Sequence, residues 1–326
     1  MSAHTGTGPD VVVLGEVLVE LASEEPLAYG SVVTLGVSGD VVNAAAAAAA
    51  AGARTAVLAR IADDELGDLI EERLLALGID TSLVRRVPGQ QAAYFLHADP
   101  TGRREFVYLR RGSAGAGLCP EDVAAAGLER AGVVLGTGVT AAISECARAA
   151  LLEAARRARR FVYDPNFRPR LTTPGAAGEV LRTVAPLAAL VTPACPGETG
   201  PLLGVEEPLA AGAAVRGLGA TSVVVTSGEE GMVVVDPDGA WHVPAVPAPG
   251  LVDQTGAGDS LAGTVAARMA LGDSLLDAVR LGGSAASLSL GGRGGTGRIA
   301  SLVESRAHLA EHHEQPVMLE HQVAHR

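Results

Sequence analysis

The fold of this chain is decided by the stretch Val252-Asp253-Gln254-Thr255-Gly256-Ala257-Gly258-Asp259-Ser260-Leu261-Ala262-Gly263. Gly256 and Gly258 carry no side chain, so successive N–H groups can face one concavity where a helix begins near Asp259. Such a concavity is an anion site. A carboxylate beside it is unfavourable unless it acts chemically, for example by taking a proton from a hydroxyl that attacks a phosphoryl group. The alternative interpretation is that Asp259 is only the N-cap of the helix.

The segment from Asp253 to Asp259 resembles the C-terminal signature of the ribokinase-like (PfkB) family of sugar and nucleoside kinases. The resemblance implies an α/β fold, a three-layer sandwich with a mostly parallel central sheet and a small β lid. It implies that Asp259 is the catalytic base and that ATP and Mg²⁺ are the cofactors. It assigns the anion hole to the amides of Gly256, Ala257 and Gly258. It also implies a monovalent cation, K⁺, near Asp253 and Thr255.

Composition places the chain in a broad class. Its 326 residues suffice for one large α/β domain, and 48% of them are hydrophobic. The net charge of −12 repels phosphodiester backbones, so we expect no nucleic acid partner. The N-terminus lacks a signal-like segment, and the longest apolar run, 44–51, is far shorter than the roughly 20 residues that span a bilayer. These features predict a cytoplasmic protein with a small-molecule substrate and no membrane partner.

The resemblance extends over about residues 10–300 and defines the expected organisation. We expect a disordered N-terminus (1–9), a kinase domain (10–305) with a lid from about 17–37 and 90–112, and a flexible His-rich tail (306–326). Lids in the family often pair, which implies a homodimer through the lid. No Gly-x-Gly-x-x-Gly follows the first β-branched run, which argues against a dinucleotide-dependent dehydrogenase.

A polar turn, Ser38-Gly39-Asp40-Val41-Val42-Asn43, precedes a run of eight alanines. Family members carry Gly-Gly-x-x-x-Asn before an alanine-rich helix, where the glycine backbone and the Asn amide bind sugar hydroxyls. Ser38 replaces the first glycine here, and Asp40 is similar to the Gly-Asp-x-x-Asn variant of sugar-acid kinases and fructokinases. Gly39, Asp40 and Asn43 are therefore candidate substrate contacts.

Residues 91–111 are typical of a β-hairpin with its turn at 99–102. Side chains alternate along a strand, so Tyr108 and Arg110 share one face. One interpretation is that Tyr94 and Tyr108 form a cross-strand pair that stiffens the ribbon. The segment from Tyr108 to Ala114 is also similar to the Tyr-x-Arg-x-x-Ser-Ala pattern of 2-keto-3-deoxygluconate kinases, which implies that Tyr94 and Tyr108 bind the substrate. Arg110 would then hold its carboxylate, which a guanidinium fork suits.

The segment Asp164-Pro165-Asn166-Phe167-Arg168 follows a predicted core strand. Ligands in open α/β sheets bind beyond the carboxyl ends of strands, so Asp164, Asn166 and Arg168 are candidate binding residues. A simple turn is the alternative, because Asp, Pro and Asn all favour turns. The segment resembles one shared by fructokinases and 2-keto-3-deoxygluconate kinases, where its arginine approaches an acid substrate.

Two further segments carry roles only through the resemblance. Glu198 occupies the place of the glutamate in the family's Asn-x-x-Glu motif, which organises water around Mg²⁺, although Cys195 stands where the Asn is expected. A solvated loop glutamate is the alternative. Thr226, Gly228 and Gly231 fall where related enzymes approach the ATP phosphates.

Together these segments predict transfer of the ATP γ-phosphoryl group to a primary hydroxyl of a sugar acid, with 2-keto-3-deoxygluconate as the expected substrate. A fructokinase or another neutral-sugar kinase is the alternative, because it shares the segments around Asn43 and Asn166. A sugar-binding sensor without catalysis is a more distant alternative.

Overall fold

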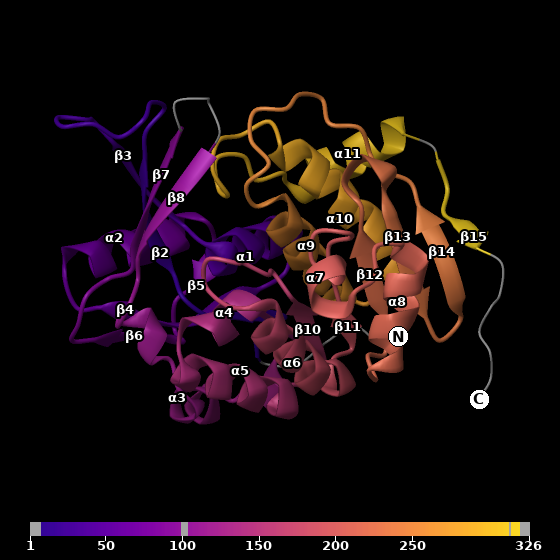
Figure 1. Cartoon of the computed structure of the whole chain (residues 1–326), viewed down its shortest axis with the longest axis horizontal. Helices are drawn as coiled ribbons and strands as arrows, with labels where there is room; N and C mark the ends of the chain where they lie inside the picture. The colour runs from indigo at the N-terminus through magenta and orange to yellow at the C-terminus, as the bar shows by residue number, and fades with distance from the viewer. Residues whose placement is uncertain (1–7, 99–103, 313, 320–326) are drawn as a thin grey trace.

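The computed structural model describes residues 8–98, 104–312 and 314–319. A large sheet runs through the molecule with helices on both faces, and a smaller sheet projects at the end formed by the N-terminal third (Figure 1). The helices are α1 (Asp40–Ala50), α2 (Glu65–Ala76), α3 (Pro120–Ala126), α4 (Gly138–Ile143), α5 (Glu145–Arg157), α6 (Pro174–Val184), α7 (Thr199–Leu203), α8 (Pro208–Gly217), α9 (Ala257–Leu271), α10 (Leu275–Ser289) and α11 (Leu302–Glu311). None of the described helices is long and apolar enough to cross a membrane.

The large sheet is mostly parallel, as expected, with antiparallel strands at one edge. Its order is β15 (Val317–Leu319), β14 (Gly239–Val243), β13 (Met232–Asp236), β12 (Val223–Thr226), β11 (Leu190–Val191), β10 (Phe161–Asp164), β9 (Val133–Thr137), β1 (Val11–Leu14), β4 (Thr55–Ala62) and β5 (Ile79–Asp80), with β6 (Val84–Val87) also paired to β4. Strand β1 pairs in parallel with β4 and β9. Strand β1 lies in the interior of the sheet between β4 and β9, and its carboxyl end meets the sheet edge where ligands bind in such folds.

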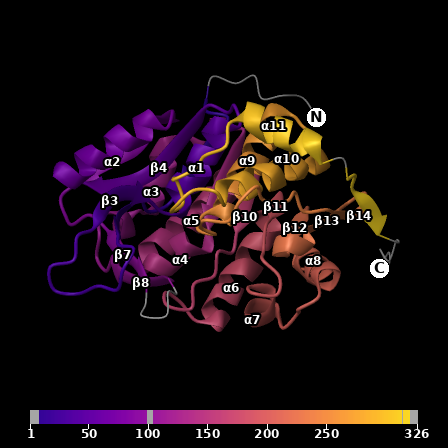
Figure 2. The same ribbon diagram turned by 90° about the horizontal axis from the view of Figure 1, so that it is seen from above.

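Alternation along β1 explains the two layers of helices. Val11 and Val13 belong to one buried cluster, packed with α1, α9 and α10, whereas Val12 and Leu14 belong to another, packed with α5 and α6. A strand that is buried on both faces has a continuous run of apolar residues, and the sequence of β1, Val-Val-Val-Leu, is such a run. Figure 2 shows α1, α9, α10 and α11 on one side of the sheet and α6 and α8 on the other.

The small sheet is formed by two separate segments of the chain, in the order β3 (Thr34–Ser38), β2 (Leu18–Ala22), β7 (Ala93–Ala98) and β8 (Arg104–Leu109). Strands β7 and β8 are antiparallel with Tyr94 opposite Tyr108, and the expected turn at 99–102 lies outside the described residues. Leu18, Tyr94, Leu96, Phe106 and Tyr108 pack together on one face.

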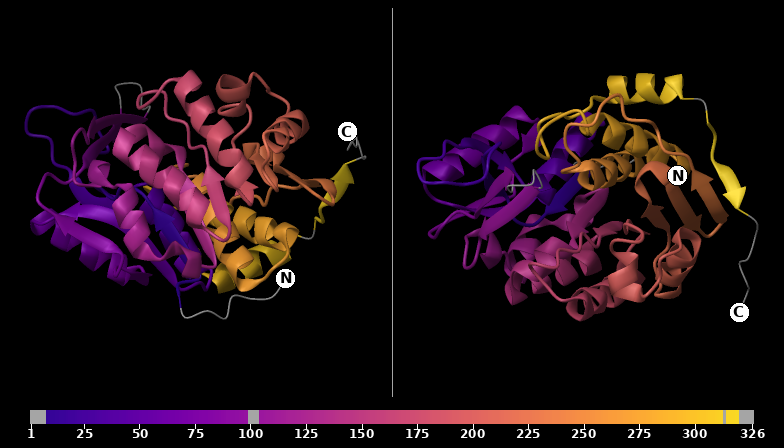
Figure 3. Two further views of the ribbon diagram at one scale, coloured as in Figure 1. Left: turned by 90° about the horizontal axis from the view of Figure 1, so that it is seen from below. Right: turned by 45° about the horizontal axis from the view of Figure 1, so that its top comes forward.

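The C-terminal segment differs from the flexible tail that its composition predicts. Helix α11 runs through residues 306–311, and β15 pairs with β14 at the edge of the large sheet (Figure 3). The local cause is a capping box, in which Ser301 and Glu304 satisfy each other's backbone N–H groups at the start of α11. Residues 313 and 320–326 lie outside the described part of the chain, as do residues 1–7 of the expected N-terminal tail.

Candidate active site

A cleft of about 660 Å³ lies between the small sheet and the carboxyl ends of the central strands. Most of the predicted site residues line it: Gly39, Asp40, Asn43, Tyr94, Tyr108, Arg110, Asp164, Asn166, Arg168, Glu198, Thr226, Thr255, Gly256, Gly258 and Asp259. Four others do not: Gly228, Gly231, Asp253 and Ala257. Residues from distant parts of the chain therefore meet in one hollow.

Asp259 lies in the first turn of α9 and is 7% exposed. Its Oδ2 accepts a hydrogen bond from Asn43 Nδ2 at 2.8 Å, and its Oδ1 accepts one from Asn166 Nδ2 at 3.0 Å. Burial, with a contribution from the charge of Asp40, raises the pKa of Asp259 from 3.8 to about 6, although both amide donors oppose the shift. The N-cap of α9 is Gly256, so the interpretation of Asp259 as the N-cap is wrong.

The loop that enters α9 is held by its own aspartate. Oδ1 of Asp253 accepts hydrogen bonds from the backbone N and the hydroxyl of Thr255 at 3.0 and 2.9 Å, and Oδ2 accepts one from Gly294 N at 2.6 Å. Gly256 adopts φ 81°, in the left-handed region that favours glycine. The loop therefore presents the amino end of a 15-residue helix to the cleft, and this end is the positive one.

Acidic groups gather at the carboxyl end of β10. Asp164 accepts from Asn166 N at 3.0 Å, so the segment does form a turn, but the same turn aims the Asn166 amide at Asp259. Asn166 has φ 40°, and its Oδ1 is buried without a hydrogen-bond partner among the described residues. Burial and the charges of Glu198 and Asp259 raise the pKa of Asp164 well above its ordinary value.

Glu198 is buried rather than a solvated loop residue. Its Oε1 accepts from Phe167 N at 2.6 Å and its Oε2 from Ala194 N at 2.9 Å, while burial raises its pKa. Within the described part of the chain, no three His, Cys, Asp or Glu side chains are arranged to hold a metal ion directly. Carboxylates that repel one another beside a cleft nevertheless fit a hydrated Mg²⁺ held through water, since Mg²⁺ usually keeps several waters.

Two glutamates, Glu16 just after β1 and Glu20 on β2, hold side chains that line the cleft, and sequence reasoning missed them. Glu16 is 2% exposed and pairs with Arg110, whose Nε donates to Glu16 Oε2 at 2.8 Å. Glu20 accepts a hydrogen bond from the hydroxyl of Tyr94, and burial together with this carboxylate raises the pKa of Tyr94. The rule that places ligands beyond the ends of parallel strands applies to Glu16, which follows β1, and was the available signal for it; it does not apply to Glu20, which lies within β2.

Of the residues predicted to approach ATP around β12, Thr226 lines the cleft, whereas Gly228 and Gly231 do not. Thr226 lines the cleft at the end of β12 and pairs with the loop at Ala194. Gly231 has φ 89°, and a side chain there would overlap the backbone oxygen of Val243, so its glycine is required by the β12–β13 connection itself. Gly228 has φ 57°, and a Cβ there would have no atom within 4 Å in the part of the chain that the structure describes.

The sequence model of the pfkB family carbohydrate kinases matches residues 9–300. The chain belongs to the PfkB family of carbohydrate kinases. The 2-dehydro-3-deoxygluconokinase of Thermoproteus tenax is 36% identical to this kinase over 290 residues, covering 87% of this chain and 89% of that enzyme. The aminoimidazole riboside kinase of Salmonella typhimurium is 26% identical over 260 residues, or 78% of each chain.

The fold comparison agrees with the family assignment. The crystal structure of a PfkB protein from Polaromonas sp. JS666 superposes with a TM-score of 0.82 at 26% identity, covering 92% of this chain and 99% of that one. The expected ribokinase-like fold is thereby confirmed. The two relatives named above differ in substrate, so family membership alone does not determine the substrate of this kinase.

Proposed function

We propose that this kinase transfers the γ-phosphoryl group of ATP to a primary hydroxyl of a sugar acid, with 2-keto-3-deoxygluconate as the substrate. The observation that carries the proposal is the position of Asp259. It is a buried carboxylate with a pKa of about 6, oriented by two amides at the positive end of a helix. The 36% identical 2-dehydro-3-deoxygluconokinase supports the choice of substrate.

In the proposed mechanism, Asp259 takes the proton of the substrate hydroxyl as that oxygen attacks the phosphoryl group. Its pKa near 6 leaves it ionised at neutral pH but still basic enough to accept a proton. The backbone amides of Gly256, Ala257 and Gly258 would steady the negative charge of the transferred group, aided by the dipole of α9. Gly39, Asp40, Asn43, Asp164 and Asn166 would contact substrate hydroxyls.

ATP would lie on the side of the cleft formed by Thr226, Gly256 and Gly258, with the turn at Gly228 and Gly231 nearby. Mg²⁺ would neutralise phosphate charge during transfer, with Glu198 acting on it through water. A monovalent cation, K⁺, would bind near Asp253 and Thr255, where Asp253 joins two loops.

The proposal of an acid substrate rests on two arginines in the cleft. Arg110 and Arg168 both line it, and the ring of Tyr108 lies 5.6 Å below the Arg110 guanidinium. Tyr94 and Tyr108 do form the cross-strand aromatic pair, with ring centroids 6.4 Å apart, and both rings also face the cleft. A neutral sugar has no group that requires two guanidinium ions. A fructokinase is the alternative because its substrate would use the same hydroxyl-binding residues.

We also propose that the kinase is cytoplasmic and forms a homodimer through its lid, here the small sheet. Val107 and Leu109 on β8 are 45% and 55% exposed, and they point away from the cleft because they alternate with Phe106 and Tyr108. An exposed apolar sheet face is a surface that a second copy can cover. Light scattering of the wild type and of Leu109→Glu tests this, with a dimer expected only for the wild type.

The test of the function is ATP consumption by the purified protein with Mg²⁺ and, in parallel, 2-keto-3-deoxygluconate, fructose or ribose. Fast turnover of the acid alone is the expected result. Preference for a neutral sugar would overturn the acid assignment, and no turnover with any sugar would favour a sensor. Arg110→Ala should raise the KM for the acid far more than the KM for a neutral analogue.

A further inference from the structure

We propose that Glu16 is a positioning residue that sets the orientation of the Arg110 guanidinium, and thereby the preference of the cleft for a carboxylate. The inference rests on the proposed function, because it assumes that Arg110 receives the carboxylate of the substrate. It extends the site to a side chain that has no direct contact with the substrate in this scheme and acts only through Arg110.

The contact between the two side chains is close and almost closed to solvent. Arg110 Nε donates to Glu16 Oε2 at 2.8 Å, and Nη2 lies 2.6 Å from the same oxygen as an ion pair without a directed hydrogen bond. The side chain of Glu16 is 1% exposed and that of Arg110 is 9% exposed. Glu16 therefore holds one edge of the guanidinium and leaves the rest for an acceptor in the cleft.

Glu16 is itself held from its other side. The hydroxyl of Ser113 donates to its Oε1, and a Cβ on Gly115 would lie 2.5 Å from its Cγ. The loop that carries Ser113 and Gly115 therefore covers the carboxylate closely, and only a glycine permits this approach. Because both of its carboxylate oxygens are bound, Glu16 has little freedom to rotate. It therefore restricts the motion of the Arg110 side chain that is bound to it.

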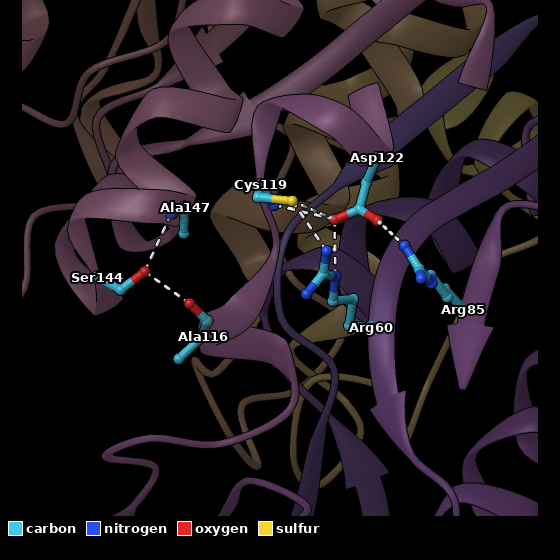
Figure 4. A network of polar contacts seen from close by, with 7 residues as sticks. All are labelled: Arg60, Arg85, Ala116, Cys119, Asp122, Ser144 and Ala147. Atoms are coloured by element: carbon cyan, nitrogen blue, oxygen red, sulfur yellow. Dashed lines mark hydrogen bonds and ion pairs between the residues drawn. The ribbon is translucent and has the colours of Figure 1, made fainter. Parts of the chain in front are cut away.

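The covering loop is anchored away from the cleft by a second polar network (Figure 4). Ser144 donates to Ala116 O at 2.6 Å, which fixes the short turn Gly115–Gly117 to the start of α5. Farther along, Arg60 on β4 donates to Asp122 at 2.7 Å and to Cys119 at 2.8 Å. The loop above Glu16 is thus tied to the core of the domain.

The pair also spans two parts of the fold. Glu16 follows β1 in the large sheet, and Arg110 follows β8 in the small sheet. A long arginine on the small sheet loses considerable side-chain entropy when it binds a ligand. Because Glu16 has already fixed it against the large sheet, a substrate carboxylate meets a guanidinium that is ordered in advance, which favours binding.

Glu16→Gln tests the proposal, because it keeps the size of the side chain and removes its charge. We expect the KM for the sugar acid to rise about tenfold, while kcat and the KM for a neutral sugar change less than about twofold. Glu72→Gln, on the exposed face of α2, is the matched control and should behave as the wild type. An unchanged KM for the acid, or an equal rise for both sugars, would overturn the positioning role.

A double-mutant cycle separates this proposal from the function on which it rests. Arg110→Ala alone tests the carboxylate assignment, and if it leaves acid selectivity intact, both proposals fall. If Arg110→Ala abolishes selectivity but Glu16→Gln does not, only the role of Glu16 falls. In the Arg110→Ala background, we expect Glu16→Gln to add less than about a twofold effect, since contacting residues are not additive. Independent, multiplying effects would overturn the proposal.

A milder variant covers the case in which Glu16→Gln does not fold. Ser113→Ala leaves the two side chains of the ion pair in place and removes the hydroxyl that donates to Oε1 and accepts from Ala116 N at 3.1 Å. We expect a smaller rise in the KM for the acid, again without a rise for the neutral sugar, and a melting temperature close to that of the wild type. No change in acid selectivity in this folded variant would count against the proposal.

Discussion

Asn43 Nδ2 donates a 2.8 Å hydrogen bond to Oδ2 of Asp259, across 216 positions of the chain. Asn166, from a third part of the chain, holds the other oxygen at 3.0 Å. Two neutral donors orient the carboxylate without supplying a full positive charge, so burial still raises its pKa to about 6. The arrangement suits a base that must be ionised near neutral pH and remain able to accept a proton.

Asp259→Asn should reduce turnover by about 10²–10⁴, the usual contribution of a general base. The amide keeps the shape of the side chain, so the affinity for the sugar should change little. Coupled ATP consumption and calorimetric sugar binding measure the two quantities. Asp238→Asn, on the exposed β13–β14 turn, is the control. Wild-type turnover in Asp259→Asn would exclude Asp259 as the base.

The same substitution should stabilise the fold at alkaline pH. The pKa of Asp259 rises from 3.8 to about 6 on folding, so the folded state favours the protonated form. This stability is present below pH 3.8 and is lost as the pH rises through about 6. Above about pH 6 the wild type must keep this buried carboxylate ionised, which lowers the free energy of unfolding by at most about 3 kcal/mol, at about 1.4 kcal/mol per pKa unit. Asp259→Asn removes this cost but also loses one hydrogen bond, so the net gain is smaller.

Thermal melting at two pH values checks this effect. The variant should melt above the wild type at pH ~8, and the difference should shrink towards pH ~4, where the wild-type carboxyl is also protonated. A variant that is less stable than the wild type by the same amount at both pH values would contradict the raised pKa.

The pH profile of kcat should have an acid limb near pH 6, because protonated Asp259 cannot accept a proton. Asp164 and Glu198 lie near Asp259 and their pKa values are also raised, so the limb reports the group of carboxyls together. Asn43→Ala removes a donor that lowers the pKa of Asp259, so its limb should move to higher pH. A wild-type profile that stays flat down to pH ~5 would be inconsistent with this site.

Much of this site could be predicted because its signals are local. The segment from Asp253 to Asp259 is contiguous, and Gly256 is needed for the left-handed turn that enters α9. Alternation in the hairpin places Tyr108 and Arg110 on one face without knowledge of the rest of the fold. Relations of this kind can be predicted from the sequence, because the direction of neighbouring side chains depends only on helix and strand geometry.

The remaining features depend on contacts between distant residues. Glu16 and Arg110 form an ion pair although they lie 94 positions apart in the sequence, and no local pattern in either segment predicts this contact. The helix α11 was missed for another reason. Its capping box at Ser301 and Glu304 is a local signal of a helix start, but the histidine-rich composition that follows is typical of a flexible tail.

Two neighbouring glycines should respond differently to alanine. Gly256 has φ 81°, and a Cβ there would lie 2.8 Å from Gly295 Cα, so Gly256→Ala should lower stability by about 1–2 kcal/mol or more. A Cβ on Gly258 would meet no atom of the described residues within 4 Å, so that variant should fold normally. Its methyl group would obstruct the anion hole, and about 10²-fold lower turnover is expected. Melting temperature and kcat of both variants are the measurements, and full activity of Gly258→Ala would refute the anion hole.

Gly295→Ala tests the link between the glycine-rich loop and the base. The Cβ would overlap the amide of Asn43, and the end of that side chain can move more easily than the backbone. Gly295 has no positive φ, so alanine should not strain the loop itself.

With Asn43 displaced from Asp259, we expect kcat to fall about tenfold and the acid limb of its pH profile to move to higher pH, because a donor that lowers the pKa of Asp259 is lost. Gly217→Ala, with open space around its Cβ near the end of α8, is the control and should leave both quantities unchanged. If Gly295→Ala lowered kcat without moving the acid limb, the loop would act on the phosphoryl group rather than through Asn43.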